Sequence, residues 1–356
     1  MHKLRRVIAR EGLDGLLVSK PVNCRYVSGF TGSSGAVLVS HKHAILATDF
    51  RYIEQAGHET RNLEITRTEG DLHDWLPQLV SSLGWHSLGF EANHICFAVH
   101  RQLKHAIRAK QLNLELIPRT GLVEHLRSTK EPGELELIVQ AANLTDAAFK
   151  QARTSIHPGT TEKSLAWEIE NLLREGGSEG VPFDLVVASG PNAALPHAKP
   201  SDRVIGQNEA VIIDMGARIE GYCSDFSRTL CLGRADEALA EIHRVVLEAQ
   251  LAGIRQITAK LTGAEADQLA RTIIEQGGRG EAFGHGLGHG VGLEVHEAPR
   301  IGPNSSDLLI DGMVFTIEPG IYVPGFGGCR IEDVVVLEKG RVRVLTESEK
   351  TVEVIQ

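Results

Sequence analysis

Five residues in the second half of the chain carry side chains suited to metal chemistry: four carboxylates and one imidazole. They are Asp214, Asp225, His289, Glu318 and Glu332. Carboxylate-dominated sites suit hard or borderline divalent cations, and a pair of such cations needs about this many oxygen ligands. The types and order of these residues therefore predict a site that activates water on two metal ions.

The first two carboxylates lie in the segment VIIDMGARIEGYCSDFSRTL. Asp214 and Asp225 are equidistant from a point between Ile219 and Glu220, so a β-hairpin closing there would put them directly opposite each other on one face. Like charges in that arrangement need something positive between them. Two solvated aspartates are the alternative. The apolar run 211–213 argues against it, because an unpaired carboxylate is costly beside a buried run.

The segment FTIEPGIYVPGFGGCRIEDVV repeats this geometry. Glu318 and Glu332 are equidistant from Gly325, in a turn rich in proline and glycine, although a bulge would shift the register. Strand alternation puts Arg330 on the face of Glu332 and Asp333 on the other. A charged surface hairpin is the alternative. Two acidic hairpins in one domain favour a shared site.

Histidines supply a third motif, FGHGLGHGVGLEVHE, in which His285, His289 and His296 stand among glycines that let the backbone approach other groups closely. Their spacing differs from HExxH, which disfavours a mononuclear zinc site on a helix. His197 follows a turn-like stretch and fits an ordinary loop histidine equally well. Neither a GxSxG motif nor a cysteine in a nucleophile context is present.

The elements that position these residues fall into two regions. Residues 1–125 alternate short strands and helices, which predicts an α/β domain with a central sheet. We expect strands over 15–19, 35–40, 43–48 and 89–91, and helices over 51–57, 71–83 and 100–110. No phosphate-binding loop follows these strands, so no nucleotide function is indicated.

The stretch 126–134 has the charge and the Pro-Gly pair of a linker, and a long helix follows it. The stretch 157–161 breaks that helix and offers a threonine, Thr160 or Thr161, to cap the next one. Beyond about residue 181, strand-like runs dominate, interrupted by helices expected over 239–258 and 264–276. Residues 126–356 are therefore predicted to form an α+β domain with a mostly antiparallel sheet.

Bulk properties exclude several protein classes. The 356-residue chain has a net charge of −9 and no basic tract, which argues against nucleic-acid binding. Its five cysteines form no CxxC pair and suit a reducing compartment. We find no signal peptide and no apolar run long enough to span a membrane. We therefore expect a soluble, cytoplasmic protein.

Together these motifs resemble the pita-bread metallopeptidases, specifically the Xaa-Pro branch of aminopeptidase P and prolidase. The matching segments are IDMG with DFSRT, HGLGHGVGLEVHE, FTIEPG and RIED, in the family's order. YVSGFTGSSGAVLV and ATDFRY resemble the smaller N-terminal domain of that branch, so the resemblance covers essentially the whole chain. It implies a pita-bread catalytic domain after an α/β domain. Asp267 and Arg271 also match, and we interpret them as structural.

The resemblance also implies a ligand set. Asp214 would bind one metal, Asp225 and Glu332 would bridge both, and His289 and Glu318 would complete the second metal's ligands. The family uses Mn²⁺, Co²⁺ or Zn²⁺, and the mostly oxygen ligands favour Mn²⁺.

The remaining roles follow from the same resemblance. Glu318 would act as general base, and His296 would polarise the scissile carbonyl. His197 and His285 would contact the substrate, with His197 near the leaving proline, and Arg330 lies near the site in the family.

The leading hypothesis from sequence is an Xaa-Pro aminopeptidase acting on short proline-containing peptides, and the alternative is an Xaa-Pro dipeptidase. A dipeptidase needs a cationic group or a blocking loop beyond the proline pocket, and no such feature is evident in the sequence. A non-catalytic peptide-binding module and a metal-independent hydrolase of the same fold are further alternatives. Neither needs the complete ligand set. A homodimer is a family expectation.

Overall fold

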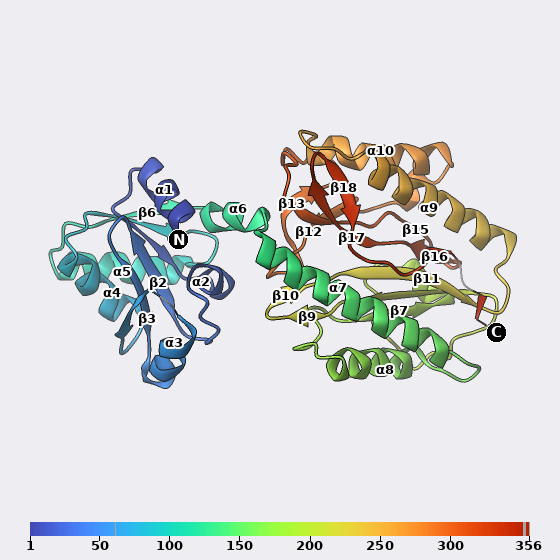
Figure 1. Ribbon diagram of the computed structural model, residues 1–356, viewed down its shortest axis with the longest axis horizontal. Coiled ribbons are helices and arrows are strands. Elements are labelled where there is room, and N and C mark those ends of the chain that lie inside the picture. Colours follow the sequence, from blue (N-terminus) through green and yellow to red (C-terminus); the bar gives the residue numbers. More distant parts are fainter. Residues whose placement is uncertain (61, 352–353, 356) are drawn as a thin grey trace. The chain divides into compact units, whose positions relative to one another are not determined.

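The computed structural model describes residues 1–60, 62–351 and 354–355. The chain divides into two compact units, Met1–Arg127 and Ser128–Gln356. Each unit combines helices with β-sheet (Figure 1). The fold is α+β with mostly antiparallel sheets in the second unit, as the sequence predicted.

The first unit is built on a six-stranded sheet with the order β4-β3-β2-β1-β5-β6. Only β2 runs antiparallel to its neighbours. Apolar side chains from both faces of the central strands pack in two cores, one containing Leu16 and Val37 and the other Leu17 and Leu38. The strands are β1 (Gly15–Val18), β2 (Ala36–Ser40), β3 (Ala44–Thr48), β4 (Glu64–Arg67), β5 (Ser87–Glu91) and β6 (Glu115–Arg119).

Helices occupy the connections of this sheet. They are α1 (His2–Arg10), α2 (Pro21–Ser28), α3 (Ile53–Glu59), α4 (Leu72–Ser82), α5 (Phe97–Ala109) and α6 (Leu122–Ser128). The strands and helices expected in this region are present, with ends shifted by a few residues. Sequence patterns missed α2, α6 and the edge strands β4 and β6. The edge strands are only partly buried and lack the apolar alternation that identifies a half-buried strand.

The second unit contains two larger sheets. A four-stranded sheet has the order β19-β11-β8-β7, and a five-stranded, wholly antiparallel sheet has the order β13-β12-β14-β17-β18. Two short hairpins, β9–β10 and β15–β16, complete the strands. The strands are β7 (Val186–Ser189), β8 (Ala210–Met215), β9 (Arg218–Ile219), β10 (Tyr222–Cys223), β11 (Phe226–Leu232), β12 (Gly288–Gly290), β13 (Glu297–Ile301), β14 (Val314–Ile317), β15 (Gly320–Val323), β16 (Gly327–Arg330), β17 (Asp333–Glu338), β18 (Arg341–Val344) and β19 (Val354–Ile355).

Each larger sheet is covered by a pair of helices (Figure 1). The helices α7 (Pro132–Ala152) and α8 (Glu162–Glu175) pack on the four-stranded sheet, and α9 (Glu237–Gln256) and α10 (Gly263–Gln276) pack on the five-stranded one. A threonine of the stretch 157–161 caps α8, as expected, and it is Thr161, which accepts a hydrogen bond from the Ser164 amide. The sheets meet where Ser227 and Glu332 form an isolated β-bridge.

The predicted linker 126–134 is largely helical. Its first residues end α6, and Pro132 begins α7, so only 129–131 separate the two helices. Pro132 occupies the first turn of α7, where its missing N–H costs nothing, and Glu131 and Glu134 form a capping box. The Pro-Gly pair that suggested a loop is thus a helix start.

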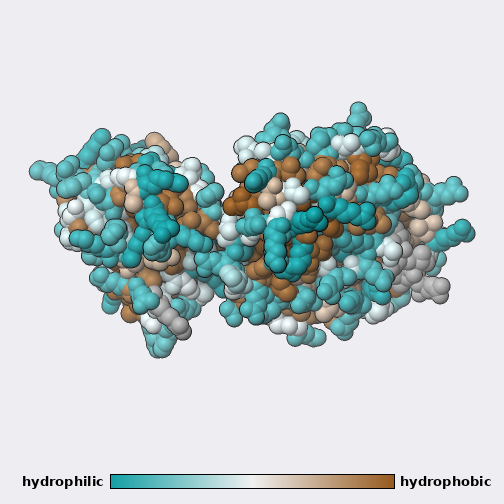
Figure 2. All heavy atoms as spheres, turned by 45° about the horizontal axis from the view of Figure 1, so that its top comes forward, coloured by the Kyte–Doolittle hydropathy of each residue, from teal (hydrophilic) through white to brown (hydrophobic). Residues whose placement is uncertain are grey.

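On the face drawn in Figure 2, hydrophilic side chains (teal) form most of the outer surface of each unit, and hydrophobic ones (brown) lie mainly among them. Among the described residues, no helix combines the length and apolar character that crossing a membrane requires.

Candidate metal centre

The hairpin that carries Asp214 and Asp225 closes two residues later in register than predicted. Its turn is Glu220–Gly221, both with positive φ, so that Ile219 pairs with Tyr222. Asp214 therefore lies opposite Ser227 and not opposite Asp225. The prediction of directly opposed carboxylates is wrong. Because the shift is an even number of residues, the two side chains still share one face as diagonal neighbours.

The second acidic hairpin has the predicted register. Ile317 pairs with Asp333 and Gly320 with Arg330, so Glu318 and Glu332 lie opposite each other. The Glu318 amide also donates to the Leu287 carbonyl (2.8 Å), and the Glu332 amide donates to the Ser227 carbonyl (3.0 Å). These bonds join the histidine motif and the first hairpin to the second.

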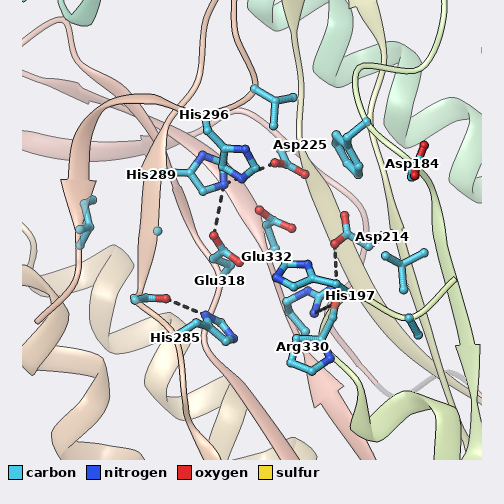
Figure 3. A pocket seen from close by; sticks show the side chains of 18 of the residues that line it. Asp184, His197, Asp214, Asp225, His285, His289, His296, Glu318, Arg330 and Glu332 are labelled. Carbon is cyan, nitrogen blue, oxygen red and sulfur yellow. Dashed lines mark hydrogen bonds and ion pairs between the residues drawn. The ribbon is translucent and has the colours of Figure 1, made fainter. Parts of the chain in front are cut away.

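A cavity of ≈ 520 Å³ brings all nine candidate residues together. They are His197, Asp214, Asp225, His285, His289, His296, Glu318, Arg330 and Glu332. In Figure 3 the four carboxylates and His289 gather around a common centre. His289 Nε2 lies 3.3 Å from Glu318 Oε1 and 3.6 Å from Asp225 Oδ2. Donor atoms of Asp225, His289 and Glu332 lie within 4.8 Å of one another.

Charge in this cluster is poorly compensated without cations. Burial, and then repulsion from neighbouring carboxylates, raises the pKa values of Asp225 and Glu332 well above the ordinary range. Burial also raises the pKa of Asp214, opposed by Arg330. Asp214 Oδ1 is buried without a hydrogen-bond partner among the described residues. The donor set thus has the properties of a cation site.

His289 is oriented with one nitrogen toward the carboxylates. Its Nδ1 lies 3.2 Å from the Gly290 carbonyl, so a proton there would leave the Nε2 lone pair directed at the cluster. Burial favours the neutral imidazole. The neighbouring Glu318 and Asp225 outweigh burial and raise the pKa of His289 to about 9 in the metal-free protein. A bound cation would compete with that proton.

Arg330 braces the other side of the cluster. It is buried and donates to Asp214 Oδ2 (2.5 Å), to Ser227 Oγ (3.0 Å) and to the Tyr322 hydroxyl (2.8 Å). Asp333 points away, as alternation predicted, and contacts Arg228. Arg330 therefore holds one carboxylate oxygen of Asp214 and leaves the other for a ligand.

Comparison with known proteins fits this geometry. Residues 136–339 match metallopeptidase family M24, and residues 1–129 match the creatinase/prolidase N-terminal domain. The chain belongs to family M24. A solved Xaa-Pro dipeptidase from Bacillus anthracis is similar to it, with 42% identity, a TM-score of 0.95, and coverage of 99% of this chain and 98% of that one.

Two further relatives carry different activities in their names. The Xaa-Pro dipeptidase of Pyrococcus horikoshii is 34% identical over 355 residues and is matched over 98% of each chain. A solved X-Pro aminopeptidase from Thermotoga maritima shares 37% identity and a TM-score of 0.92, covering 99% of each chain.

The histidines of this M24 peptidase differ in whether their ring nitrogens are free to bind a substrate. His197 and His296 are exposed, and their ring nitrogens make no hydrogen bond to any residue that the structure describes. By contrast, His285 Nδ1 lies 2.8 Å from the Gly286 carbonyl, and its Nε2 lies 3.0 Å from the Tyr322 hydroxyl. His285 can thus meet a ligand with its ring carbons while keeping both hydrogen bonds.

Sequence patterns missed three side chains of the site in this M24 peptidase. The Thr316 hydroxyl accepts from the His289 amide (3.1 Å) and donates to Glu318 Oε1 (3.2 Å), and Tyr322 joins Arg330 to His285. Thr316 could have been found, because strand alternation puts it on the face of Glu318.

The third missed side chain is Arg300, a cationic group of the kind that a dipeptidase needs and that was not evident in the sequence. Arg300 lines the cavity, is exposed, and is paired across β12–β13 with His289. Its guanidinium makes neither an ion pair nor a hydrogen bond within the described part of the chain. No motif marked it, since its position depends on the bulged register of that strand pair.

Proposed function

We propose that this M24 peptidase is an Xaa-Pro dipeptidase that works with two divalent cations, of which Mn²⁺ suits the oxygen-rich ligand set best. The observation that carries the proposal is the cluster of four carboxylates around His289. The similarity to Xaa-Pro dipeptidases supports proline-containing dipeptides as substrates. An Xaa-Pro bond is a tertiary amide without an N–H, so it requires a site of its own.

The residues fit two cations. Asp214 offers a carboxylate oxygen that has no hydrogen-bond partner among the described residues. Asp225, His289 and Glu332 each offer a ligand atom, and these three atoms lie within 4.8 Å of one another. In the proposed arrangement the two ions would be held by Asp214, Asp225, His289, Glu318 and Glu332. Bound cations would neutralise these carboxylates, polarise the scissile carbonyl and lower the pKa of a water molecule.

The protein's own groups then move the proton and hold the substrate. Glu318 accepts the proton of the attacking water. In the protein without cations, burial works against its charged form, but His289 lowers the pKa of Glu318 to about 2. His296 donates a hydrogen bond to the scissile carbonyl oxygen, and His197 lies near the leaving proline nitrogen. Both have free ring nitrogens in the cavity.

Arg300 favours the dipeptidase over the aminopeptidase that leads from sequence alone. An Xaa-Pro dipeptide ends in a carboxylate directly after the proline ring, whereas in a longer peptide that position is a neutral amide. An exposed guanidinium in the cavity, without an acidic partner among the described residues, suits such a carboxylate. The likeness to the Thermotoga maritima enzyme keeps the aminopeptidase as the second candidate.

The test compares Ala-Pro with Ala-Pro-Ala after chelation and after Mn²⁺ is added back. We expect Mn²⁺-dependent cleavage of the dipeptide. Turnover of the tripeptide alone would establish the aminopeptidase instead. Full activity in excess chelator, or with Asp225→Asn, would refute the two-cation mechanism.

Arg300→Met tests the carboxylate contact. Losing a charge-assisted hydrogen bond worth about 1.5–3 kcal/mol should lower kcat/KM for Ala-Pro by about 10- to 100-fold. Arg343→Met is the matched control, because Arg343 is partly exposed, lies outside the cavity and pairs with Glu338. An unchanged kcat/KM for Arg300→Met would show that another group receives the carboxylate.

A further inference from the structure

A buried ion pair lies directly behind the metal centre. Arg228 Nη2 donates to Asp333 Oδ1 at 2.8 Å, and their side chains are 2% and 0% exposed. Neither residue lines the cavity. Isolated buried ion pairs contribute little net stability. A completely buried pair beside a site is therefore a candidate for positioning the residues of that site.

All five N–H groups of Arg228 are used. Two Nη1 bonds go to the carbonyls of Ser227 (3.0 Å) and Glu332 (2.5 Å). The Nη2 group donates to the Ser348 carbonyl (2.8 Å) as well as to Asp333, and Nε donates to the Glu349 carbonyl (2.9 Å). A guanidinium has five donors, so this set is complete. It joins β11, β17 and the segment 346–350.

Asp333 is equally saturated. Its Oδ1 also accepts from the Thr346 hydroxyl (2.8 Å), and its Oδ2 accepts from Gln250 Nε2 and Lys350 Nζ, both at 2.5 Å. A carboxylate has about four acceptor sites, and four donors occupy them here. The segment 346–350 is therefore fixed to α9 and β17 through one side chain.

This network reaches the backbone of the ligand Glu332 directly and that of the ligand Asp225 through Ser227. Glu332 donates its amide to the Ser227 carbonyl, and Arg228 holds both the Ser227 and Glu332 carbonyls from behind. Asp225 is two residues before Ser227 and shares its face, while Arg228 points the other way. The guanidinium thus holds together the starts of β11 and β17, directly after Asp225 and Glu332.

We propose that Arg228 and Asp333 are positioning residues of the metal centre, which tie the strands of Asp225 and Glu332 to the segment 346–350. The inference rests on the proposed two-cation function. Outer partners of metal ligands typically change metal affinity by about 10- to 100-fold when removed. Lysine has three donors, so Arg228→Lys leaves at least two of these five acceptors without their bond and keeps the charge.

The experiment measures Mn²⁺ binding by calorimetry on chelator-treated full-length protein, with Co²⁺ absorption spectra and circular dichroism beside it. We expect folded Arg228→Lys to bind Mn²⁺ about 10- to 100-fold more weakly and to show an altered Co²⁺ spectrum. Arg244→Lys is the matched control, because Arg244 is an exposed arginine on α9 that pairs with Glu241 and Glu248. It should bind Mn²⁺ as the wild type does.

Folded Arg228→Lys with an affinity within about threefold of wild type and an unchanged Co²⁺ spectrum overturns the proposal, whatever its melting temperature, because Arg228 would then be structural only. If this variant does not fold, Lys350→Met decides by the same criterion, since Lys350 is partly exposed and touches Asp333 from one side. The measurement needs no peptide. Wild-type protein that binds Mn²⁺ but cleaves no Xaa-Pro dipeptide would refute the proposed function alone.

Discussion

Replacing Arg330 by methionine should expose the electrostatic cost of the carboxylate cluster. The guanidinium, 4% exposed, is the hydrogen-bond partner of Asp214 Oδ2, and Asp214 Oδ1 already has none. The change also removes donors to Ser227, Pro196 and Tyr322. Removing one partner of a buried pair costs about 3–5 kcal/mol, which is roughly a 10²- to 10⁴-fold rise in the unfolding equilibrium constant.

Urea unfolding of the chelator-treated protein, followed by circular dichroism, measures this loss. Arg343→Met is the control, because its partly exposed pair with Glu338 should contribute only about 0–1 kcal/mol. Arg330→Lys, which keeps the charge but not the fork of donors, should lie between wild type and Arg330→Met. A loss below about 1 kcal/mol for Arg330→Met would refute the argument that Asp214 depends on this cation.

Two further predictions concern groups outside the site. Burial lowers the pKa of His243 to about 4, so its contribution to stability is present above pH 6.5 and is lost as the pH falls toward 4. Urea unfolding at pH 7 and 4.5 should show wild type losing about 2–3 kcal/mol more than His243→Gln. An equal loss would contradict this. Cys96 is the one exposed thiol among the five, so a thiol reagent should label one cysteine rapidly in native protein and five after denaturation. Rapid labelling of more than one would show that the cores open. The other four cysteines, whose pKa values burial raises, are Cys24, Cys223, Cys231 and Cys329.

Strand alternation was enough to predict one acidic hairpin and not the other. Around Gly325 the register is uniform, so counting residues from the turn identifies Glu318 and Glu332 as opposed. In the first hairpin the chain turns at Glu220–Gly221, where both residues have positive φ. Glutamate is an unusual first residue for such a turn, and the symmetric count therefore selected the wrong centre. Asp214 and Asp225 still share one face of the hairpin, because the register differs from the prediction by two residues, an even number.

Long-range contacts were beyond sequence patterns. Tyr322 and Arg228 contact residues brought close only by the assembled sheets, and the same assembly places Arg300 in the cavity. None of the three stands at a spacing that marks chemistry. Arg228 does lie within the DFSRT segment that carries the family resemblance. Its role became visible only through its bonds to Glu332 and to the segment 346–350.

The charge arrangement explains why the site needs support from behind. Four carboxylates face one another, Arg330 is paired with one of them, Asp214, and burial with repulsion raises the pKa values of Asp225 and Glu332. Such a cluster tends to separate or to take up protons, and either outcome would remove oxygen ligands. The backbone hydrogen bond from Glu332 to Ser227, and the bonds of Arg228 to both carbonyls, oppose the separation. The backbone is thus held most firmly where the charges repel each other most, and a preformed cation site requires such rigidity.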